Sequence, residues 1–212
     1  MRQELLSKVL KVGSLAGLLG IFSEYFYYKD YWHPPGIFGP TTIALEDFVL
    51  AFAITALSFI TYVWIFSHKF SKPIYPVRYR LYLLFFVAGL SVMFLFNSYL
   101  GFNSVLVSSA VFVLFSVVMM LQRRDLIRVS LYSVGVIILY IIGVYIILFD
   151  VLSPQFWDRY WLLANTKLGI TILGNIPLTE IIWYISWILF ASISYPYVSG
   201  RAIKPAKQHT RP

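Results

Sequence analysis

The sequence predicts an all-α membrane protein with about six transmembrane helices in two related three-helix halves. Three observations predict this class: 59% of the 212 residues are apolar, only 12% are charged, and long apolar stretches recur along the chain. Soluble domains carry about 25% charged residues, so a soluble globular enzyme is excluded. Intrinsic disorder is excluded as well, because it requires low hydrophobicity and high charge. The chain has no cysteine, which excludes thiolate catalysis and cysteine-built metal sites. We expect neither a metal nor a cofactor.

Each predicted helix is a stretch of about 20 mainly apolar residues, the length that crosses about 30 Å of hydrocarbon. The six stretches cover residues 12–28, 44–66, 81–100, 103–121, 129–149 and 176–197. The first is short, but no small-residue cleavage site follows it, so we expect a retained span rather than a signal peptide. We expect one membrane domain over residues 1–200, with halves of about 1–100 and 101–200, and a basic cytoplasmic tail over residues 201–212.

The basic residues are distributed unevenly between the two sides of the predicted bundle. Six spans place both termini on one side, and 14 of the 17 lysines and arginines lie in segments on that side. Because basic loops stay in the cytoplasm, we expect a multi-pass protein of the cell membrane with both termini cytoplasmic. The net charge of +8 is then a topology signal, and no nucleic-acid partner is expected. The tail is also suited to contact anionic headgroups of the lipid bilayer.

Acidic residues open two of the predicted helices in similar surroundings. Glu46 and Asp47 begin the second span, and Glu180 follows Pro177 at the start of the sixth, each after an aromatic, acidic outer loop. Acids in a first helical turn complement the helix dipole, so simple capping is one interpretation. Ionisable groups beside apolar runs are also functional candidates, and membrane proteins often place sites between repeated halves. Neighbouring helical residues point about 100° apart, so only one of Glu46 and Asp47 can face a given pocket.

These residues resemble the lycopene cyclase domain family of integral-membrane carotenoid cyclases. The family marker is Pro-x-Glu-(Glu/Asp) at the start of a membrane helix. Residues 44–47 read Ala-Leu-Glu-Asp, which keeps both acids, and residues 177–180 read Pro-Leu-Thr-Glu, which keeps the proline and one acid. Through span count, repeat and motif placement, the resemblance covers roughly residues 10–197.

The resemblance implies acid-initiated ring closure of a lycopene-like acyclic end, a redox-neutral isomerisation. Glu46, Asp47 and Glu180 would supply the acid or base. The candidate substrate-binding residues are aromatic, since π-faces stabilise a carbocation, although ordinary helix packing also explains aromatic residues in such a chain. They are Phe48, Trp183, Tyr184 and Trp187. The implied partners are an apolar isoprenoid or carotenoid substrate and a second subunit, in a homo- or heterodimer.

Three functions remain open at this stage. The first is a carotenoid or isoprenoid cyclase. The second is a non-catalytic carotenoid- or lipid-binding protein, or a subunit, with the cyclase fold. The third is a small transporter, which should carry polar residues through the middle of several spans. Here the strong acids cluster at one end of the spans, which favours lipid chemistry over a polar path through the bundle.

Overall fold

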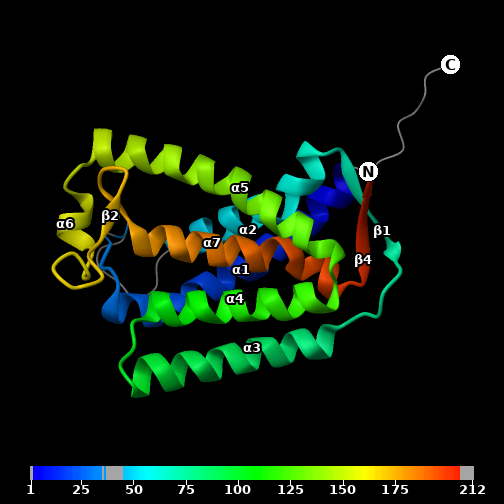
Figure 1. The fold of residues 1–212 in the computed structure, drawn as a ribbon, viewed down its shortest axis with the longest axis horizontal. Helices are drawn as coiled ribbons and strands as arrows, with labels where there is room; N and C mark the ends of the chain where they lie inside the picture. The colour runs from blue at the N-terminus through cyan, green and yellow to red at the C-terminus, as the bar shows by residue number, and fades with distance from the viewer. Residues whose placement is uncertain (1, 35, 37–44, 206–212) are drawn as a thin grey trace.

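The computed structural model describes residues 2–34, 36 and 45–205. Within these ranges six helices are long and apolar enough to cross a membrane, which confirms the predicted fold class. They lie roughly side by side along the long axis of the molecule (Figure 1). Whether the two halves are structurally related stays a prediction.

The six long helices match the predicted stretches within a few residues at most ends. They are α1 (Arg2–Asp30), α2 (Leu45–Ile65), α3 (Tyr79–Met93), α4 (Ser104–Gln122), α5 (Asp125–Tyr145) and α7 (Leu178–Val198). Two are prolonged by π-helical segments, α3 by η1 (Phe94–Tyr99) and α5 by η2 (Ile146–Leu152). The first helix begins ten residues earlier than predicted, because the lysines before residue 12 lower the hydropathy but favour the helix.

Helix α7 is the centre of the bundle. It packs against α2, α4 and α5, while α1 lies along α2 and α3 packs on the outer side of α4. The α1–α2 contact is close, because a Cβ on Gly20 would lie 2.6 Å from the Cβ of Ala51. Glycine is therefore required at position 20 for these two helix backbones to approach each other.

At one end of the bundle, the end where the described chain begins and ends (the terminal end), two strands pair. Strand β1 (His68–Pro73) pairs antiparallel with β4 (Arg201–Pro205), with Lys69 opposite Lys204. Buried Arg123 binds the Asp125 carboxylate and the main-chain oxygen of Pro196, which ties the α4–α5 turn to α7. The first five residues of the predicted tail thus form β4, and residues 206–212 lie outside the described residues.

The opposite end, the far end, is covered by aromatic residues between the helix ends. The short helix α6 (Phe156–Tyr160) and the strands β2 (Thr171–Ile172) and β3 (Ile176–Pro177) lie here. A bridge joins Trp32 to Trp161 in the main chain. The buried cluster at this end contains Tyr27, Tyr31, Val105, Trp157, Trp161 and Leu163.

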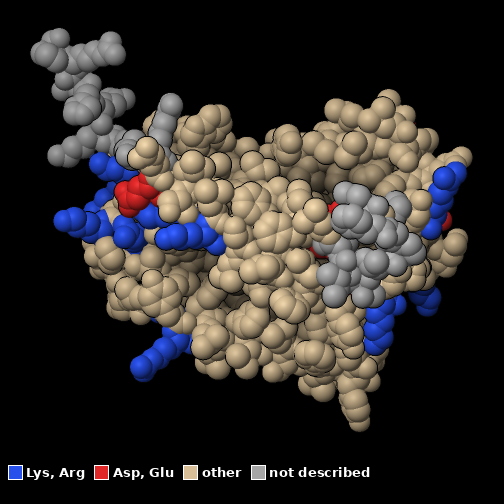
Figure 2. All heavy atoms as spheres, turned by 180° about the vertical axis from the view of Figure 1, so that it is seen from behind, with Lys and Arg blue, Asp and Glu red and all other residues tan. Residues whose placement is uncertain are grey.

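The charge distribution agrees with a membrane-spanning bundle. On the face shown in Figure 2, lysine and arginine side chains gather toward the two ends, and a broad belt without them lies between. Many large apolar side chains are exposed along the helices, among them Phe22, Leu83 and Leu139. A bilayer would cover such a belt.

Candidate functional site

The bundle encloses a cavity of about 920 Å³ lined by side chains of α1, α2, α3, α4 and α7. On α1 the lining extends from Val12 to Tyr27, which is about 22 Å of helix at about 1.5 Å per residue. Most lining residues are aliphatic or aromatic, and the carboxyl groups in the lining come from Glu24, Asp47 and Glu180. All three lie toward the far end, so the cavity is a long apolar channel with a polar end.

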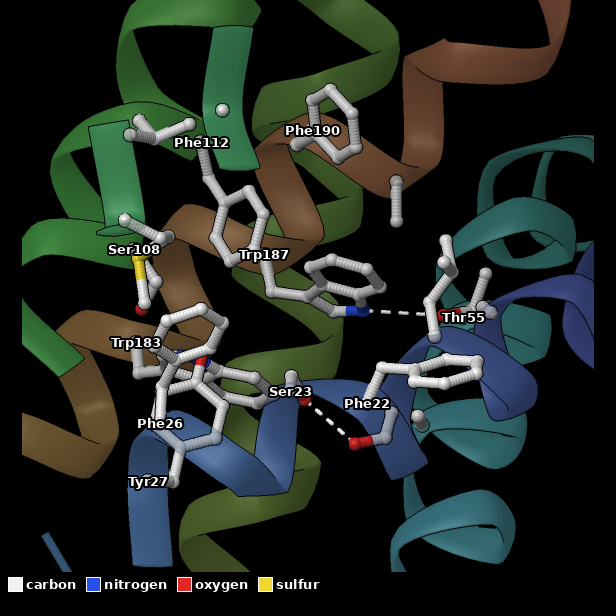
Figure 3. A pocket seen from close by; sticks show the side chains of 18 of the residues that line it. Phe22, Ser23, Phe26, Tyr27, Thr55, Ser108, Phe112, Trp183, Trp187 and Phe190 are labelled. Carbon is white, nitrogen blue, oxygen red and sulfur yellow. Dashed lines mark hydrogen bonds between the residues drawn. The ribbon is translucent and has the colours of Figure 1, made fainter. Parts of the chain in front are cut away.

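Tryptophan side chains of α7 form one wall of this cavity (Figure 3). The rings of Trp183 and Trp187 are nearly parallel, at 2°, with their centroids 6.0 Å apart. Trp183 Nε1 donates to the Tyr27 hydroxyl at 2.9 Å, and Trp187 Nε1 donates to Thr55 Oγ1 at 3.2 Å. These hydrogen bonds hold both indole rings in place beside the cavity. Tyr184, the third aromatic predicted on this helix, also lines the cavity.

The Glu180 carboxyl group is held by two phenols from other parts of the bundle. The Tyr31 hydroxyl donates to Oε1 at 2.5 Å, and the Tyr145 hydroxyl donates to Oε2 at 2.8 Å. The hydroxyl oxygens of Tyr145 and Tyr184 are 2.8 Å apart. A phenol has a single hydrogen, so when Tyr145 donates to Glu180, Tyr184 donates to Tyr145. Every group in this hydrogen-bond network then has a partner, although Glu180 is only 7% exposed.

Tyr31 remains a hydrogen-bond donor at all physiological pH values. It directly follows α1, and it is only 3% exposed. Burial raises the pKa of the Tyr31 hydroxyl well above its ordinary value, and the charge of Glu180 raises this pKa further. The phenol therefore keeps its proton and presents it to Glu180.

Asp30, the residue before Tyr31, holds the end of α1 in position. Its carboxylate accepts hydrogen bonds from the Ser104 main-chain N–H at 2.9 Å and from the Ser104 hydroxyl and the Asn97 amide at 2.5 Å. A carboxylate at this place also complements the positive end of α4. The end of α1 is thus fixed to the start of α4, and the direction in which Tyr31 leaves α1 is set.

The local sequence explains why Glu180 faces the cavity. Pro177 precedes α7 with an extended backbone, φ −61° and ψ 131°, and the Leu178 N–H donates to the Ile170 oxygen. Proline suits a position next to a helix start because its missing N–H needs no partner there. The first turn of α7 then carries Thr179 and Glu180 into the buried region, where the Thr179 hydroxyl lies 3.3 Å from that of Tyr31.

Of the adjacent acids at the start of α2, one lines the cavity. Asp47 is buried and belongs to the lining, whereas Glu46 and Phe48 are not among the described residues that line it. The Phe48 ring stacks on Phe52 and packs over Gly17 of α1. Helical geometry is the reason, because a residue next to Asp47 is turned by about 100°. Ala44, where the family marker has proline, lies outside the described residues.

Glu24 is a lining residue that is not among the site residues predicted from the sequence. It is 3% exposed, its Oε2 accepts a long hydrogen bond of 3.4 Å from Trp32 Nε1, and it interacts electrostatically with Asp47. Its position within an apolar span was the signal that could have identified it. Tyr31 and Tyr145 were also missed, and nothing in the sequence separates them from the other 14 tyrosines.

The arrangement favours proton chemistry on an apolar molecule. Within the described ranges, no group of three or more His, Asp or Glu side chains is placed to hold a metal ion. The lining combines carboxyl groups, phenols and tryptophan rings with an otherwise apolar surface. Fold and site together define a polytopic membrane protein with an apolar, acid-ended cavity.

Comparison with known proteins agrees with the resemblance drawn from the helix starts. Residues 103–198 match the family model of lycopene cyclase. This region contains α4, α5 and α7, and therefore Glu180, Trp183 and Trp187. No curated protein and no solved structure gives a match to the chain. The resemblance to the lycopene cyclase family is confirmed over this region, and it supports a carotenoid cyclase-like function.

Proposed function

We propose that the protein is a membrane-embedded cyclase that closes a ring at the end of an acyclic isoprenoid such as lycopene. The observation that carries the proposal is a buried carboxyl group, Glu180, hydrogen-bonded by two phenols at the far end of a long apolar cavity. The family match over residues 103–198 supports the same function.

The cavity suits a polyene in both size and shape. Its volume of about 920 Å³ is at the upper end of the range for small-molecule pockets, about 300–1,000 Å³. The apolar channel along α1 would hold the body of the chain, and one terminal group would lie at the far end. Access from the bilayer is consistent with an apolar substrate that dissolves in lipid.

The proposed reaction is an isomerisation. A carboxylic acid gives a proton to the terminal alkene, and a tertiary cation forms. The neighbouring alkene attacks this cation and closes a six-membered ring, and loss of a ring proton to a carboxylate leaves a new double bond. The product is an isomer of the substrate, so no redox equivalent is consumed. The faces of Trp183 and Trp187 would stabilise the cation, since aromatic rings attract positive charge, and the apolar walls would keep water from it.

Expression in a lycopene-accumulating host, followed by chromatography of the pigments, tests the proposal. We expect cyclic carotenoids from the wild type and a loss of about 10²–10⁴-fold for Glu180→Gln, because removal of an acid–base group has this effect. Asp158→Asn, an exposed acid at the same end, is the matched control and should retain wild-type activity.

The alternative function is binding of a carotenoid or other lipid without turnover. The same cavity would serve it, and pigment would then copurify with the protein unchanged. If the wild type makes no cyclic product, or if Glu180→Gln forms product within a few-fold of wild type, the catalytic proposal is rejected. A dimer and cytoplasmic termini remain further expectations of this proposal.

A further inference from the structure

Of the three carboxyl groups that line the cavity among the described residues, those of Glu24 and Glu180 differ in their hydrogen bonding, and this contrast indicates different roles. Both oxygens of Glu180 already accept a hydrogen bond from a phenol, one from Tyr31 and one from Tyr145. Hydrogen bonds donated to a carboxyl group favour its ionised form. The two phenol donors therefore offset part of the cost of burying a negative charge on Glu180.

Glu24 is bound differently. Its Oε2 receives only the long contact from Trp32, and its Oε1, fully buried, has no hydrogen-bond partner among the described residues. A charged carboxylate with so little compensation is costly in an apolar site. The neighbouring Asp47 carboxyl group adds repulsion between like charges. The neutral acid avoids both costs, and its O–H is free to point into the cavity.

We infer that Glu24 is the proton donor of the reaction and that Glu180 is the carboxylate that stabilises the cation and takes the proton at the end. This inference rests on the proposed cyclase function and divides its two proton transfers between two residues. It extends the set of catalytic residues to a position outside both copies of the helix-start motif. Environments that favour opposite protonation states are a general means of assigning acid and base.

The steps balance in atoms and electrons. The Glu24 O–H bond breaks as a C–H bond forms at the terminal alkene, and the electron pair of that bond stays on Glu24. The π electrons of the next alkene form the ring bond, which moves the positive charge into the ring. A ring C–H bond then breaks, its electrons become the new double bond, and Glu180 takes the proton. Between turnovers, Glu180 releases a proton and Glu24 takes one up.

Labelling in heavy water separates the two roles. Membranes containing each variant are supplied with lycopene in D₂O, and deuterium is measured in both products and recovered substrate. The wild type should introduce one deuterium for each ring. Glu24→Gln should give neither cyclic product nor labelled substrate. Glu180→Gln should lose the normal cyclic product yet still label, either in recovered substrate through reversible protonation or in an alcohol formed when water captures the cation.

Several results would overturn the assignment. Ring closure by Glu24→Gln within about threefold of wild type would remove Glu24 as donor, and unlabelled material from Glu180→Gln would make Glu180 the donor. If Glu24→Gln does not fold, Glu24→Asp is the deciding variant. Its side chain keeps a carboxyl proton but is one methylene shorter, so ring formation at the wild-type rate would contradict the role of Glu24 as proton donor. A wild type that forms no rings refutes the cyclase function itself, and Glu24's role falls with it.

Discussion

The Glu180 carboxyl group at the start of α7 accepts two hydrogen bonds from other elements. One comes from Tyr31, directly after α1, and the other from Tyr145, the last residue of α5. A hydrogen bond to a charged group contributes about 1.5–3 kcal/mol. Such bonds also fix the direction of the carboxylate, which matters when it must meet a cation at a defined ring carbon. In the proposed reaction, the phenols at residues 31 and 145 would therefore be positioning residues for Glu180.

Tyr145→Phe tests this role. The change removes the hydroxyl that contacts Glu180 and Tyr184 and leaves the ring in place. We expect kcat to fall by about 10- to 150-fold, which corresponds to about 1.5–3 kcal/mol, while KM changes little because the cavity is unaltered. The control is Tyr140→Phe on the same helix, where the side chain is 60% exposed. Equal activity of the two variants in the pigment assay would show that the hydroxyl is dispensable.

At the scale of elements, the site depends on how closely α1 and α2 approach. A Cβ on Gly20 would lie 2.8 Å from the main-chain oxygen of Asp47, in addition to its contact with Ala51. Glu24 is one helical turn further along α1, so the same close approach brings the Glu24 and Asp47 carboxyl groups to the same part of the cavity. Residues in or beside the π-helical segments also contact the site, since η1 contains Asn97, which donates to Asp30, and η2 begins directly after Tyr145.

Gly20→Ala should move the two helices apart. We expect a loss of about 1–3 kcal/mol of stability from overpacking, measured as a lower thermal unfolding temperature in detergent, together with reduced ring formation. Gly143→Ala is the matched control, because a Cβ there meets no described atom within 4 Å; it should gain up to about 1 kcal/mol from helix propensity. An unfolding temperature for Gly20→Ala at or above that of Gly143→Ala would contradict the packing argument.

At the scale of the whole molecule, an even number of spans brings both ends of the described chain to the terminal end, and the acid end of the cavity lies at the far end. Three of the 17 basic residues belong to far-end segments: Lys29, Arg159 and Lys167. The excess of basic residues at the terminal end predicts that this end faces the cytoplasm. The carboxyl groups would then lie near the outer leaflet.

A reporter that is active only in the cytoplasm should be active when fused after residue 212 and inactive when inserted in the loop near Lys167. The physical reason is the cost of moving many basic groups across the bilayer against the insertion bias. The two fusions serve as controls for each other. The reverse pattern would place the acid end of the cavity in the cytoplasmic leaflet and would contradict the charge argument.

Much of the fold could be predicted from hydropathy, because each span must satisfy its own backbone hydrogen bonds and present apolar side chains to lipid. The short elements at the two ends could not. Helix α6 has five residues and strands β2 and β3 have two each, so they form only because the ends of longer helices bring their partners together. The beginning of α1 was missed for a different reason, since hydropathy measures membrane burial and not helix length.

The candidate site was partly predictable. Glu180, Asp47, Trp183, Tyr184 and Trp187 all line the cavity, and an acid beside apolar sequence is a signal in itself. Which of Asp47 and Glu46 faces the cavity could not be predicted, because this depends on how α2 is rotated about its axis relative to α1. The structure shows that it is Asp47.

The sequence by itself determined that this chain crosses the membrane with six helices and carries acids at the far-end starts of two of them, because both properties depend on residues that are neighbours in the chain. Only the tertiary structure decided which groups surround those acids. Tyr31 and Tyr145 reach Glu180 across 149 and 35 residues of sequence, and Glu24 meets Asp47 from another helix. Contacts of this kind depend on helix rotation and packing, and these are set by all the helices of the bundle together.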